Sequence, residues 1–159
     1  MCKEQYYIEW DERFILGIPI IDKQHEDLVR ICNNLHWACL KDQRVADSRF
    51  ILTANEAFDY ARRHFSTEEK LMFLLDFSEF SEHKKEHENF IKEISSRYKQ
   101  FEEGDHFAPN HFVHFLSEWI FSHITICDKK FADLFLSMNH YSKFKQTLMG
   151  RVELTPHPA

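Results

Sequence analysis

Glycine and proline are scarce in this chain of 159 residues, which contains 3 Gly and 4 Pro, with two of the prolines among the last four residues. β-Branched clusters are also few. Tight turns need glycine and proline, and strands are rich in β-branched residues. The scarcity of all three favours long uninterrupted helices and predicts an all-α fold. The length suits one domain that buries a core of its own.

Long apolar runs, basic clusters and paired cysteines are also missing. The net charge is −6 and no run of Lys and Arg occurs, which argues against nucleic acid and anionic membranes as partners. The one apolar stretch near the N-terminus, residues 14–21, is short and broken by Gly17 and Pro19, so we expect neither a signal peptide nor a membrane span. A cytoplasmic location is predicted. The four cysteines form no CxxC pair and are expected to be reduced thiols, with Cys32 and Cys39 as small buried hydrophobes.

Four segments carry inward-facing residues at alternating intervals of three and four, as bundle helices do. The first covers about residues 20–41. The second runs to about residue 76 from a possible cap at Asp47. The third starts at Ser78 or Ser81 and ends at Gly104, which suits a left-handed exit from a helix. The fourth runs from near Pro109, suited to a first helical turn, to about residue 138.

Short connections between these segments favour antiparallel neighbours. We therefore predict an up-down-up-down antiparallel four-helix bundle with an irregular N-terminal arm, residues 1–138, followed by a polar C-terminal tail, residues 139–159. A coiled-coil rod is the rival for such a pattern, but the predicted loops are too frequent for one.

Polar side chains occupy positions that the helical period assigns to the core. Burying a carboxylate such as Glu68 costs several kcal/mol or more unless it is paired or bound to a cation. No lysine or arginine on an inward-facing stripe is placed to pair with Glu68. The one basic residue on such a stripe, Arg97, is at the far end of its helix. The polar residues come from all four helices, and Asp128 lies just past the inward-facing stripe of the fourth. They are His25, His64, Glu68, His83, His87, His123 and Asp128.

The spacing of these residues supports a shared centre. His64 and Glu68 are four residues apart, as are His83 and His87, so each pair projects from one face of its helix. His123 and Asp128 are five apart, about 140° around an ideal helix, so a long carboxylate reach or a local π-type bulge near Ile126 is needed to bring them together. A single inward-facing histidine is more often a hydrogen-bonded core residue than a ligand. Seven convergent groups point to metal.

Five imidazoles and two carboxylates exceed the needs of one tetrahedral zinc, and the absence of thiolate clusters argues against structural zinc or iron–sulfur. Ferritin-like di-iron proteins use four carboxylates with Glu-x-x-His pairs. The one comparable spacing here, Glu103 to His106, straddles the predicted helix break at Gly104. Two octahedral irons in a nitrogen-rich site fit the donor count.

The order H, HxxxE, HxxxH, HxxxxD resembles the hemerythrin family, in particular its bacterial single-domain members. The local sequence also resembles that family in four stretches: GIPIIDKQH at residues 17–25, HFSTEE at 64–69, HKKEH at 83–87 and the stretch from Trp119 to Asp128. The resemblance covers about residues 8–138. Two features depart from the pattern: the stretch from His87 to His123 is longer than in the compact oxygen carriers, and Phe77-Ser78 stands where Tyr-Pro is frequent.

The resemblance implies reversible O2 binding at an oxo- or hydroxo-bridged pair of non-haem irons, for storage, transport or scavenging. By the same resemblance His83, His87 and His123 bind one iron, His25 and His64 bind the other, and Glu68 and Asp128 bridge both. The second iron then has an open position for O2, with NO and small anions as further candidates. The apolar pocket wall of the family corresponds here to Leu28, Phe65, Trp119, Ile120 and Ile124. Taken singly, each of these five is equally well explained as core.

Three other functions compete with oxygen binding. A di-iron sensor of oxygen, nitric oxide or redox state is expected to be fused to a signalling domain, and none is recognised here. A peroxidase-like or nitric-oxide-handling enzyme needs a proton donor beside the open iron, and the sequence offers only Cys127, next to Asp128, as a conceivable redox group. A metal-free, histidine-rich bundle is the remaining alternative. We expect a binding protein without catalytic residues.

Overall fold

A computed structural model of the chain describes residues 6–138. The predicted polar tail, residues 139–159, and Cys2 lie outside the described residues. The helical elements in chain order are η1 (Glu12–Phe14), α1 (Pro19–Cys39), α2 (Gln43–Leu74), α3 (Phe80–Glu102), α4 (Ala108–Trp119), η2 (Ile120–Asp128) and α5 (Lys129–Ser137). η1 is a single 3₁₀ turn and η2 is a π-helix. Backbone angles remain helical from α4 through η2 into α5, so these three form one continuous fourth helix.

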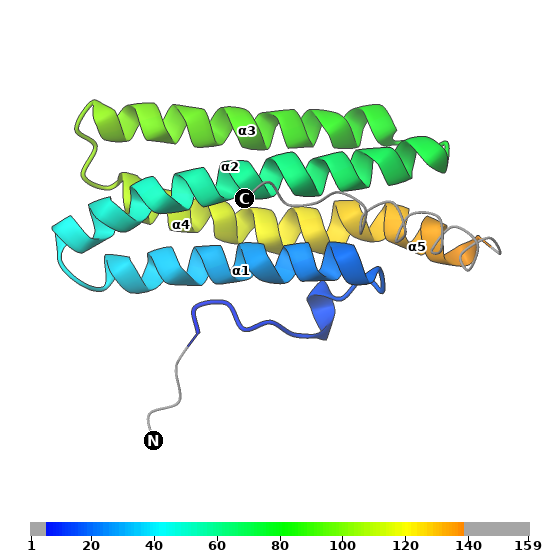
Figure 1. Cartoon of the computed structure of the whole chain (residues 1–159), viewed down its shortest axis with the longest axis horizontal. Helices are drawn as coiled ribbons and strands as arrows, with labels where there is room; N and C mark the ends of the chain where they lie inside the picture. Colours follow the sequence, from blue (N-terminus) through cyan, green and yellow to red (C-terminus); the bar gives the residue numbers. More distant parts are fainter. Residues whose placement is uncertain (1–5, 139–159) are drawn as a thin grey trace, which may run out of the picture.

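The helices form an antiparallel bundle in which each helix runs opposite to its neighbours in the chain (Figure 1). α1 packs against α2 and the fourth helix, and α3 packs against the same two. The predicted all-α, up-down-up-down four-helix bundle is therefore confirmed. Because alternate helices run in opposite directions, residues early in α1 and α3 lie level with residues late in α2 and in the fourth helix.

The N-terminal arm packs along the bundle, as predicted. Ile8 and Phe14 are buried, and Trp10 stacks on Phe14 with ring centroids 5.5 Å apart. The Asn33 side chain fixes the arm to α1, since it accepts a hydrogen bond from the Ile8 N–H and donates one to the Ile8 carbonyl, both at 2.8 Å. The arm closes an otherwise open side of the core with both apolar and polar contacts.

Two predicted helix starts are wrong. Asp47 does not cap α2; Asp42 does, because its carboxylate accepts a hydrogen bond from the Val45 N–H at 3.1 Å, and the helix begins at Gln43. α3 begins at Phe80 with Glu79 at the N-cap and no side-chain cap, so neither Ser78 nor Ser81 starts it. Buried Phe77 sets this turn instead, since its N–H donates to the Met72 carbonyl and its carbonyl accepts from the Phe80 N–H. Other boundaries agree closely with prediction, including Pro109 in the first turn of α4 and Gly104 in the left-handed conformation with φ +99°.

The π-helix η2 changes which residues of the fourth helix face inward. Regular spacing predicts Cys127 and Leu134 on the inward stripe, but Cys127 is only half-buried and Leu134 is exposed. Asp128 and Phe135, each one position later, are buried instead. A π-helix bonds each residue to the fifth one along rather than the fourth, which advances the inward stripe by one residue per bulge. Of the two alternatives that the sequence left open, a long carboxylate reach or a π-type bulge, the structure has the π-type segment, and it covers Ile120–Asp128.

The apolar core consists of two separate clusters. The larger cluster contains Leu28, Phe65, Phe90 and Trp119, and it extends through the half of the bundle near the α1–α2 connection. The smaller contains Ile21, Leu71, Met72 and Phe131 near the α2–α3 connection. His25 lies between Ile21 and Leu28 on α1, and Glu68 lies between Phe65 and Leu71 on α2. A polar layer therefore crosses the bundle where the two clusters meet.

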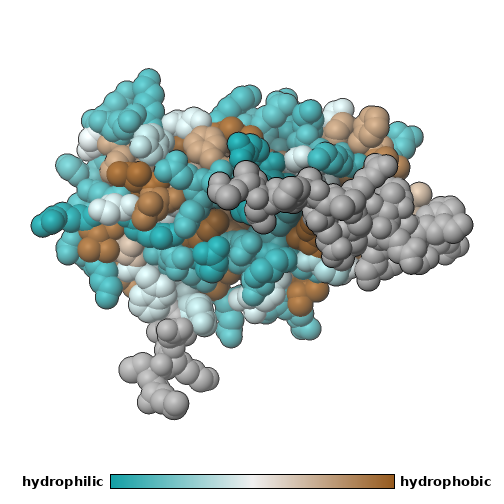
Figure 2. Space-filling model, viewed as in Figure 1, coloured by the Kyte–Doolittle hydropathy of each residue, from teal (hydrophilic) through white to brown (hydrophobic). Residues whose placement is uncertain are grey.

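The face drawn in Figure 2 is mainly hydrophilic, with separate hydrophobic patches rather than one continuous apolar surface. Several large apolar side chains at helix ends are exposed, among them Phe73 and Phe107. Within residues 6–138, no helix combines the length and the apolar character that crossing a bilayer demands.

The cap of α2 allows a direct test of the corrected boundary. Replacing Asp42 with Ala removes an acceptor for a backbone N–H at the helix end and is expected to lower the free energy of unfolding by about 1 kcal/mol. Asp47→Ala is the matched control, because the Asp47 carboxylate lies one turn inside the helix and only accepts an exposed hydrogen bond from the Gln43 side chain; its effect is expected to stay within about 0.5 kcal/mol. Urea unfolding of both variants measures the difference, and a larger loss for Asp47→Ala would contradict this boundary.

Candidate metal centre

The polar layer consists of the seven residues that the sequence singled out. All of them are buried, with exposed fractions between 0 and 4%. They come from all four helices of the bundle: His25 on α1, His64 and Glu68 on α2, His83 and His87 on α3, and His123 and Asp128 on η2. Their donor atoms fall into two groups, and within each group all atoms lie within 4.8 Å of one another.

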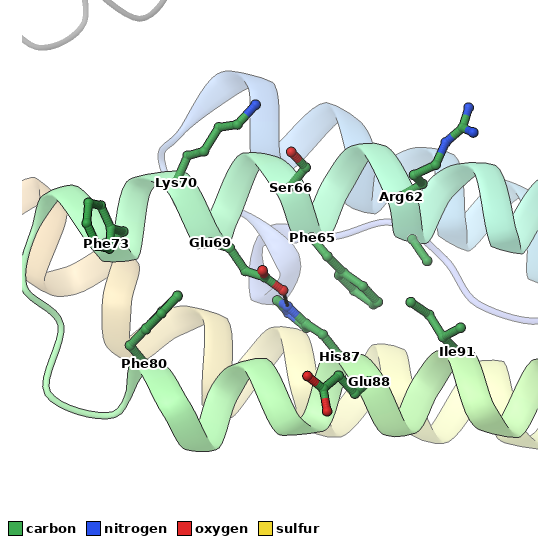
Figure 3. A pocket seen from close by; sticks show the side chains of 11 residues that line it. Arg62, Phe65, Ser66, Glu69, Lys70, Phe73, Phe80, His87, Glu88 and Ile91 are labelled. Atoms are coloured by element: carbon green, nitrogen blue, oxygen red, sulfur yellow. Dashed lines mark hydrogen bonds and ion pairs between the residues drawn. The ribbon is translucent and has the colours of Figure 1, made fainter.

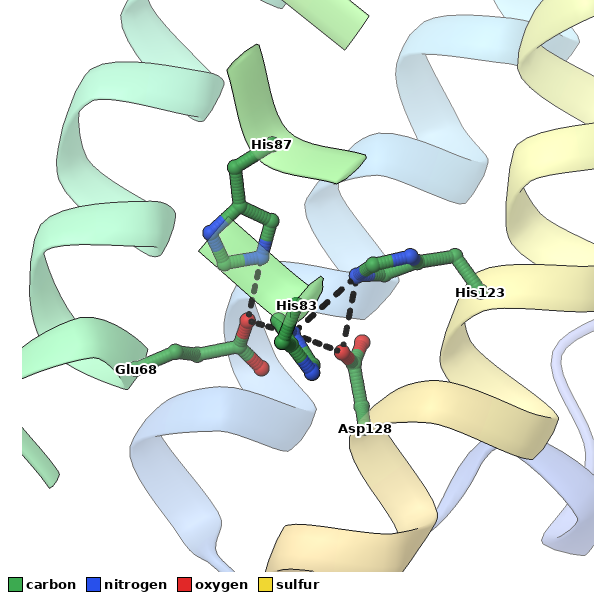
Figure 4. A group of neighbouring side chains, drawn as sticks. All are labelled: Glu68, His83, His87, His123 and Asp128. Carbon is green, nitrogen blue, oxygen red and sulfur yellow. Dashed lines mark hydrogen bonds and ion pairs between the residues drawn. The ribbon is translucent and has the colours of Figure 1, made fainter. Parts of the chain in front are cut away.

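The first group contains three histidines (Figure 4). His83 Nε2 lies 3.2 Å from His123 Nε2, and Asp128 Oδ1 lies 3.1 Å from each of these nitrogens. His87 Nε2 lies 3.2 Å from Glu68 Oε2. Three imidazole nitrogens and one oxygen from each carboxylate thus converge at one point between α2, α3 and η2.

The second group contains two histidines. His25 Nε2 lies 3.2 Å from His64 Nε2 and 3.1 Å from Asp128 Oδ2. Glu68 Oε1 lies 3.4 Å from His64 Nε2 and 4.0 Å from His25 Nε2. This group therefore has two imidazole nitrogens and, again, one oxygen from each carboxylate.

The two carboxylates connect the groups. Glu68 directs Oε1 at the two-histidine group and Oε2 at the three-histidine group, and Asp128 divides its oxygens in the same way. The π-helix makes this possible for Asp128, because its five-residue spacing from His123 equals one turn of a π-helix. Both side chains then leave the same face of the fourth helix.

The outer nitrogens of two histidines bind acceptors that fix the orientation of their rings. His64 Nδ1 donates to Gln24 Oε1 at 2.9 Å, and His87 Nδ1 donates to Glu69 Oε1 at 3.1 Å. A neutral imidazole that carries its proton on Nδ1 has its lone pair on Nε2, which is the form that binds a metal. Burial, together with His83 and His123, lowers the pKa of His87 to about 2, so this ring is neutral.

The two carboxylates are buried with little compensating charge. Burial opposes a charge on His83, but its interactions with Asp128 and Glu68 outweigh burial and raise the pKa of His83 to about 9, and one imidazolium cannot neutralise both carboxylates. Neither oxygen of Glu68 or Asp128 makes a hydrogen bond with a residue in the range 6–138, and no Lys or Arg in that range forms an ion pair with them. Burial first, and then the charge of Asp128, raises the pKa of Glu68 to about 8. An isolated negative charge is therefore costly here, and a cation would offset the cost.

The spacing of the donor atoms fits metal ions. Two ligand atoms bound at right angles to one metal, each at about 2.1 Å, are about 3.0 Å apart. The shortest distances within each group, 3.1 and 3.2 Å, are close to this value. Two Nε2 atoms that face one another at 3.2 Å can share only one proton, whereas a cation between them can be bound by both lone pairs. The donor set therefore fits two metal positions that share both carboxylates.

The five residues predicted as a pocket wall are all buried in the larger core cluster, which adjoins the polar layer. Phe65 lies flat against His87 with ring centroids 3.8 Å apart and an angle of 4°, and Trp119 lies in the same way against His123 at 3.8 Å and 14°. Leu28, Ile120 and Ile124 are completely buried. The structure thus surrounds one side of the polar layer with apolar side chains, although their role in ligand binding stays a prediction.

A groove of about 460 Å³ lies between α2 and α3 and reaches the outer side of this layer (Figure 3). His87 and Phe65 line its inner part, and Glu69 points into it toward His87. Arg62 and Lys70 stand at the rim and point away from its centre. The Glu69–His87 hydrogen bond is therefore the part of the site nearest to solvent on this face.

Gln24 and Glu69 are candidate functional residues that sequence reasoning missed. Each stands next to a predicted ligand in the chain, Gln24 before His25 and Glu69 after Glu68, but each binds a ligand on a different helix. No spacing rule links them to His64 and His87. The other histidines of the described residues lie outside the site: His106, His111 and His114 are exposed, and half-buried His36 stacks on Tyr7. His140 and His157 lie outside the described residues.

A bundle with two such groups of histidines, joined by shared carboxylates, defines a class of metal-binding helical domains. The family model of the hemerythrin HHE cation-binding domain matches residues 16–135. The chain belongs to the hemerythrin family.

Curated relatives agree with this assignment. The chain is 34% identical over 124 residues to a bacteriohemerythrin of Stenotrophomonas maltophilia, covering 78% of each protein. It is 32% identical over 127 residues to a bacteriohemerythrin of Pseudomonas aeruginosa, covering 80% of each. A bacteriohemerythrin of Clostridium acetobutylicum is 30% identical over 127 residues, which cover 78% of this chain and 98% of that protein.

The Glu69–His87 hydrogen bond is expected to influence metal affinity without providing a ligand. Outer partners of this kind typically contribute 10- to 100-fold to metal affinity, so we expect Glu69→Ala to weaken binding of Fe²⁺ by about that factor. Glu69→Gln keeps an oxygen acceptor, like Gln24 beside His64, and is expected to retain most of the affinity.

Glu88→Ala is the matched control, because Glu88 lines the same groove but forms no ion pair with a residue in the described part of the chain. Anaerobic competition with a chelator of known affinity measures all three variants. Equal affinity in Glu69→Ala and Glu88→Ala would show that the hydrogen bond does not orient His87 for metal.

Proposed function

We propose that this chain binds O2 reversibly at a centre of two non-haem irons. One observation carries the proposal: Glu68 and Asp128 each turn one oxygen to a group of three histidines and the other to a group of two. Family membership supports iron as the metal, and the names of the curated relatives support oxygen binding.

The unequal groups define where a ligand would bind. His83, His87 and His123 with one oxygen from each carboxylate provide five donors, and His25 and His64 with the other two oxygens provide four. The three-histidine group would therefore hold the first iron with one more donor than the two-histidine group offers the second, so a small ligand would bind on the side of His25 and His64. When bound, the irons supply the open position on that side and the electrons that O2 binding requires. The chain's own residues decide the rest.

The surrounding side chains hold the site rigid and dry. Phe65 and Trp119 cover two histidine rings face to face, and Leu28, Ile120 and Ile124 fill the space on the same side. Such a wall admits a small apolar molecule such as O2, while it excludes water and larger substrates. NO and small anions such as azide are further ligands of suitable size.

The same features favour a binding protein over an enzyme. Cys127, the one redox-active side chain proposed from the sequence, is half-buried, whereas neighbouring Asp128 turns into the site. A sensor remains the second candidate, since its metal centre would have the same geometry and differ in the fate of the bound ligand. The predicted cytoplasmic location stays a prediction.

The decisive functional experiment is an anaerobic titration. The iron-loaded protein is reduced, exposed to O2 in steps and followed by visible absorption, and argon is then used to remove the gas. We expect a charge-transfer band that appears with O2 and disappears on deoxygenation over several cycles. Rapid irreversible conversion to the oxidised, O2-insensitive form would contradict a carrier and favour the sensor or the enzyme.

Replacing Glu68 with Ala tests the shared ligand. The side chain serves both metal positions in the proposed centre, so its removal is expected to reduce the iron content from two ions per chain to well below one. Glu86→Ala is the control, because Glu86 is an exposed carboxylate between His83 and His87 on the same helix as both. Iron is measured by a colorimetric assay on desalted protein. Full two-iron loading in Glu68→Ala would rule out the proposed bridge.

A further inference from the structure

Tyr60 has a buried hydroxyl group without a partner. The residue lies on α2, one turn before His64, and is 2% exposed. Its hydroxyl makes no hydrogen bond with any residue between 6 and 138. Buried hydroxyl groups almost always bind protein or water, because leaving one unpaired costs free energy. The hydroxyl therefore needs a partner that residues 6–138 do not provide.

The ring of Tyr60 lies against the two-histidine side of the polar layer. It stacks on His64 with centroids 4.8 Å apart and an angle of 22°, and it contacts the edges of Phe65 at 6.2 Å and Phe90 at 6.4 Å. Phe65 and Phe90 both pack on Trp119, at 5.9 and 4.6 Å. Tyr60 thus extends the aromatic wall from His87 and His123 to His64.

The hydroxyl group can donate a hydrogen bond as well as accept one. Because the ring that carries it is buried and stacks on His64, this unpaired group lies in the bundle interior next to the polar layer.

We propose that the Tyr60 hydroxyl donates a hydrogen bond to the small ligand that binds on the His25 and His64 side of the centre. This inference rests on the proposed function, which places the open coordination position on that side. The ligand atom accepts, and no covalent bond or electron transfer is involved. Sequence reasoning did not find this hydroxyl, whose ring stacks on His64. Its role is to hold O2, or an anion in its place, against dissociation.

The test compares Tyr60→Phe with Tyr98→Phe in the iron-loaded protein. Tyr98 is a half-buried tyrosine near the far end of α3, where it packs against Phe50 and Phe101 away from the polar layer. Azide is the probe for the oxidised protein and O2 for the reduced protein. Loss of one hydrogen bond is expected to raise the dissociation constant of each ligand about three- to tenfold in Tyr60→Phe and to leave it unchanged in Tyr98→Phe.

A spectroscopic signature separates hydrogen bonding from a change in shape. The antisymmetric stretch of bound azide is expected to shift between H2O and D2O in the wild-type protein, and this shift should vanish in Tyr60→Phe. Unchanged azide and O2 affinity, or an isotope shift that persists in the variant, would overturn the role of Tyr60.

Two further measurements distinguish the possible failures. Iron content tests the centre itself. If the wild-type chain takes up no iron, the proposed function is wrong and this inference is wrong with it. If only Tyr60→Phe loses iron, the hydroxyl is a structural part of the centre, and the inference alone is overturned. Unfolding of the iron-free protein tests the missing partner. Tyr60→Phe is expected to unfold at the same or a higher urea concentration than wild type, because an unpaired hydroxyl contributes nothing to the folded state. A clear destabilisation would reveal an internal partner and overturn the inference.

Discussion

The constraint on which this structure depends is the placement of two carboxylates in the dry interior of a helical bundle. Glu68 and Asp128 are completely buried, and within residues 6–138 only imidazole rings face them. In a medium of low dielectric constant, such charges need cations or strong hydrogen bonds. Within the described residues no lysine or arginine pairs with them, and imidazole nitrogens surround the carboxylates at ligand spacing instead. The polar layer that divides the core therefore has the donor set of a site that could hold metal ions.

The fourth helix shows how backbone geometry adapts to this constraint. An unbroken α-helix would direct Cys127 into the polar layer and Asp128 away from it. The π-helix from Ile120 to Asp128 instead brings His123 and Asp128 onto one face. π-Segments are uncommon and occur often at functional sites, because they exchange regular hydrogen bonding for a particular side-chain direction. Here the gain is a carboxylate whose two oxygens face different groups of histidines. The same shift places Phe135 in the core beyond the centre.

Much of this architecture was predictable because each signal was local. Intervals of three and four residues identified the helices and the inward positions of His64, Glu68, His83 and His87, and the five-residue interval before Asp128 indicated the bulge. The missed features depend on contacts between distant parts of the chain. Asp42 rather than Asp47 caps α2, since the turn after α1 determines where the helix begins, and packing of Phe77 rather than a serine starts α3. Likewise, Gln24 and Glu69 bind histidines of other helices, which only the packed bundle reveals.

In the proposed centre the two groups of histidines form a single binuclear site, and the positions of the metal ions test this most directly. Diffraction from crystals of the iron-loaded protein, recorded on both sides of the iron absorption edge, locates iron by its anomalous scattering. The account predicts two peaks per chain, one among His83, His87 and His123 and the other between His25 and His64, with Glu68 and Asp128 reaching both. A single peak, or none within the polar layer, would contradict it.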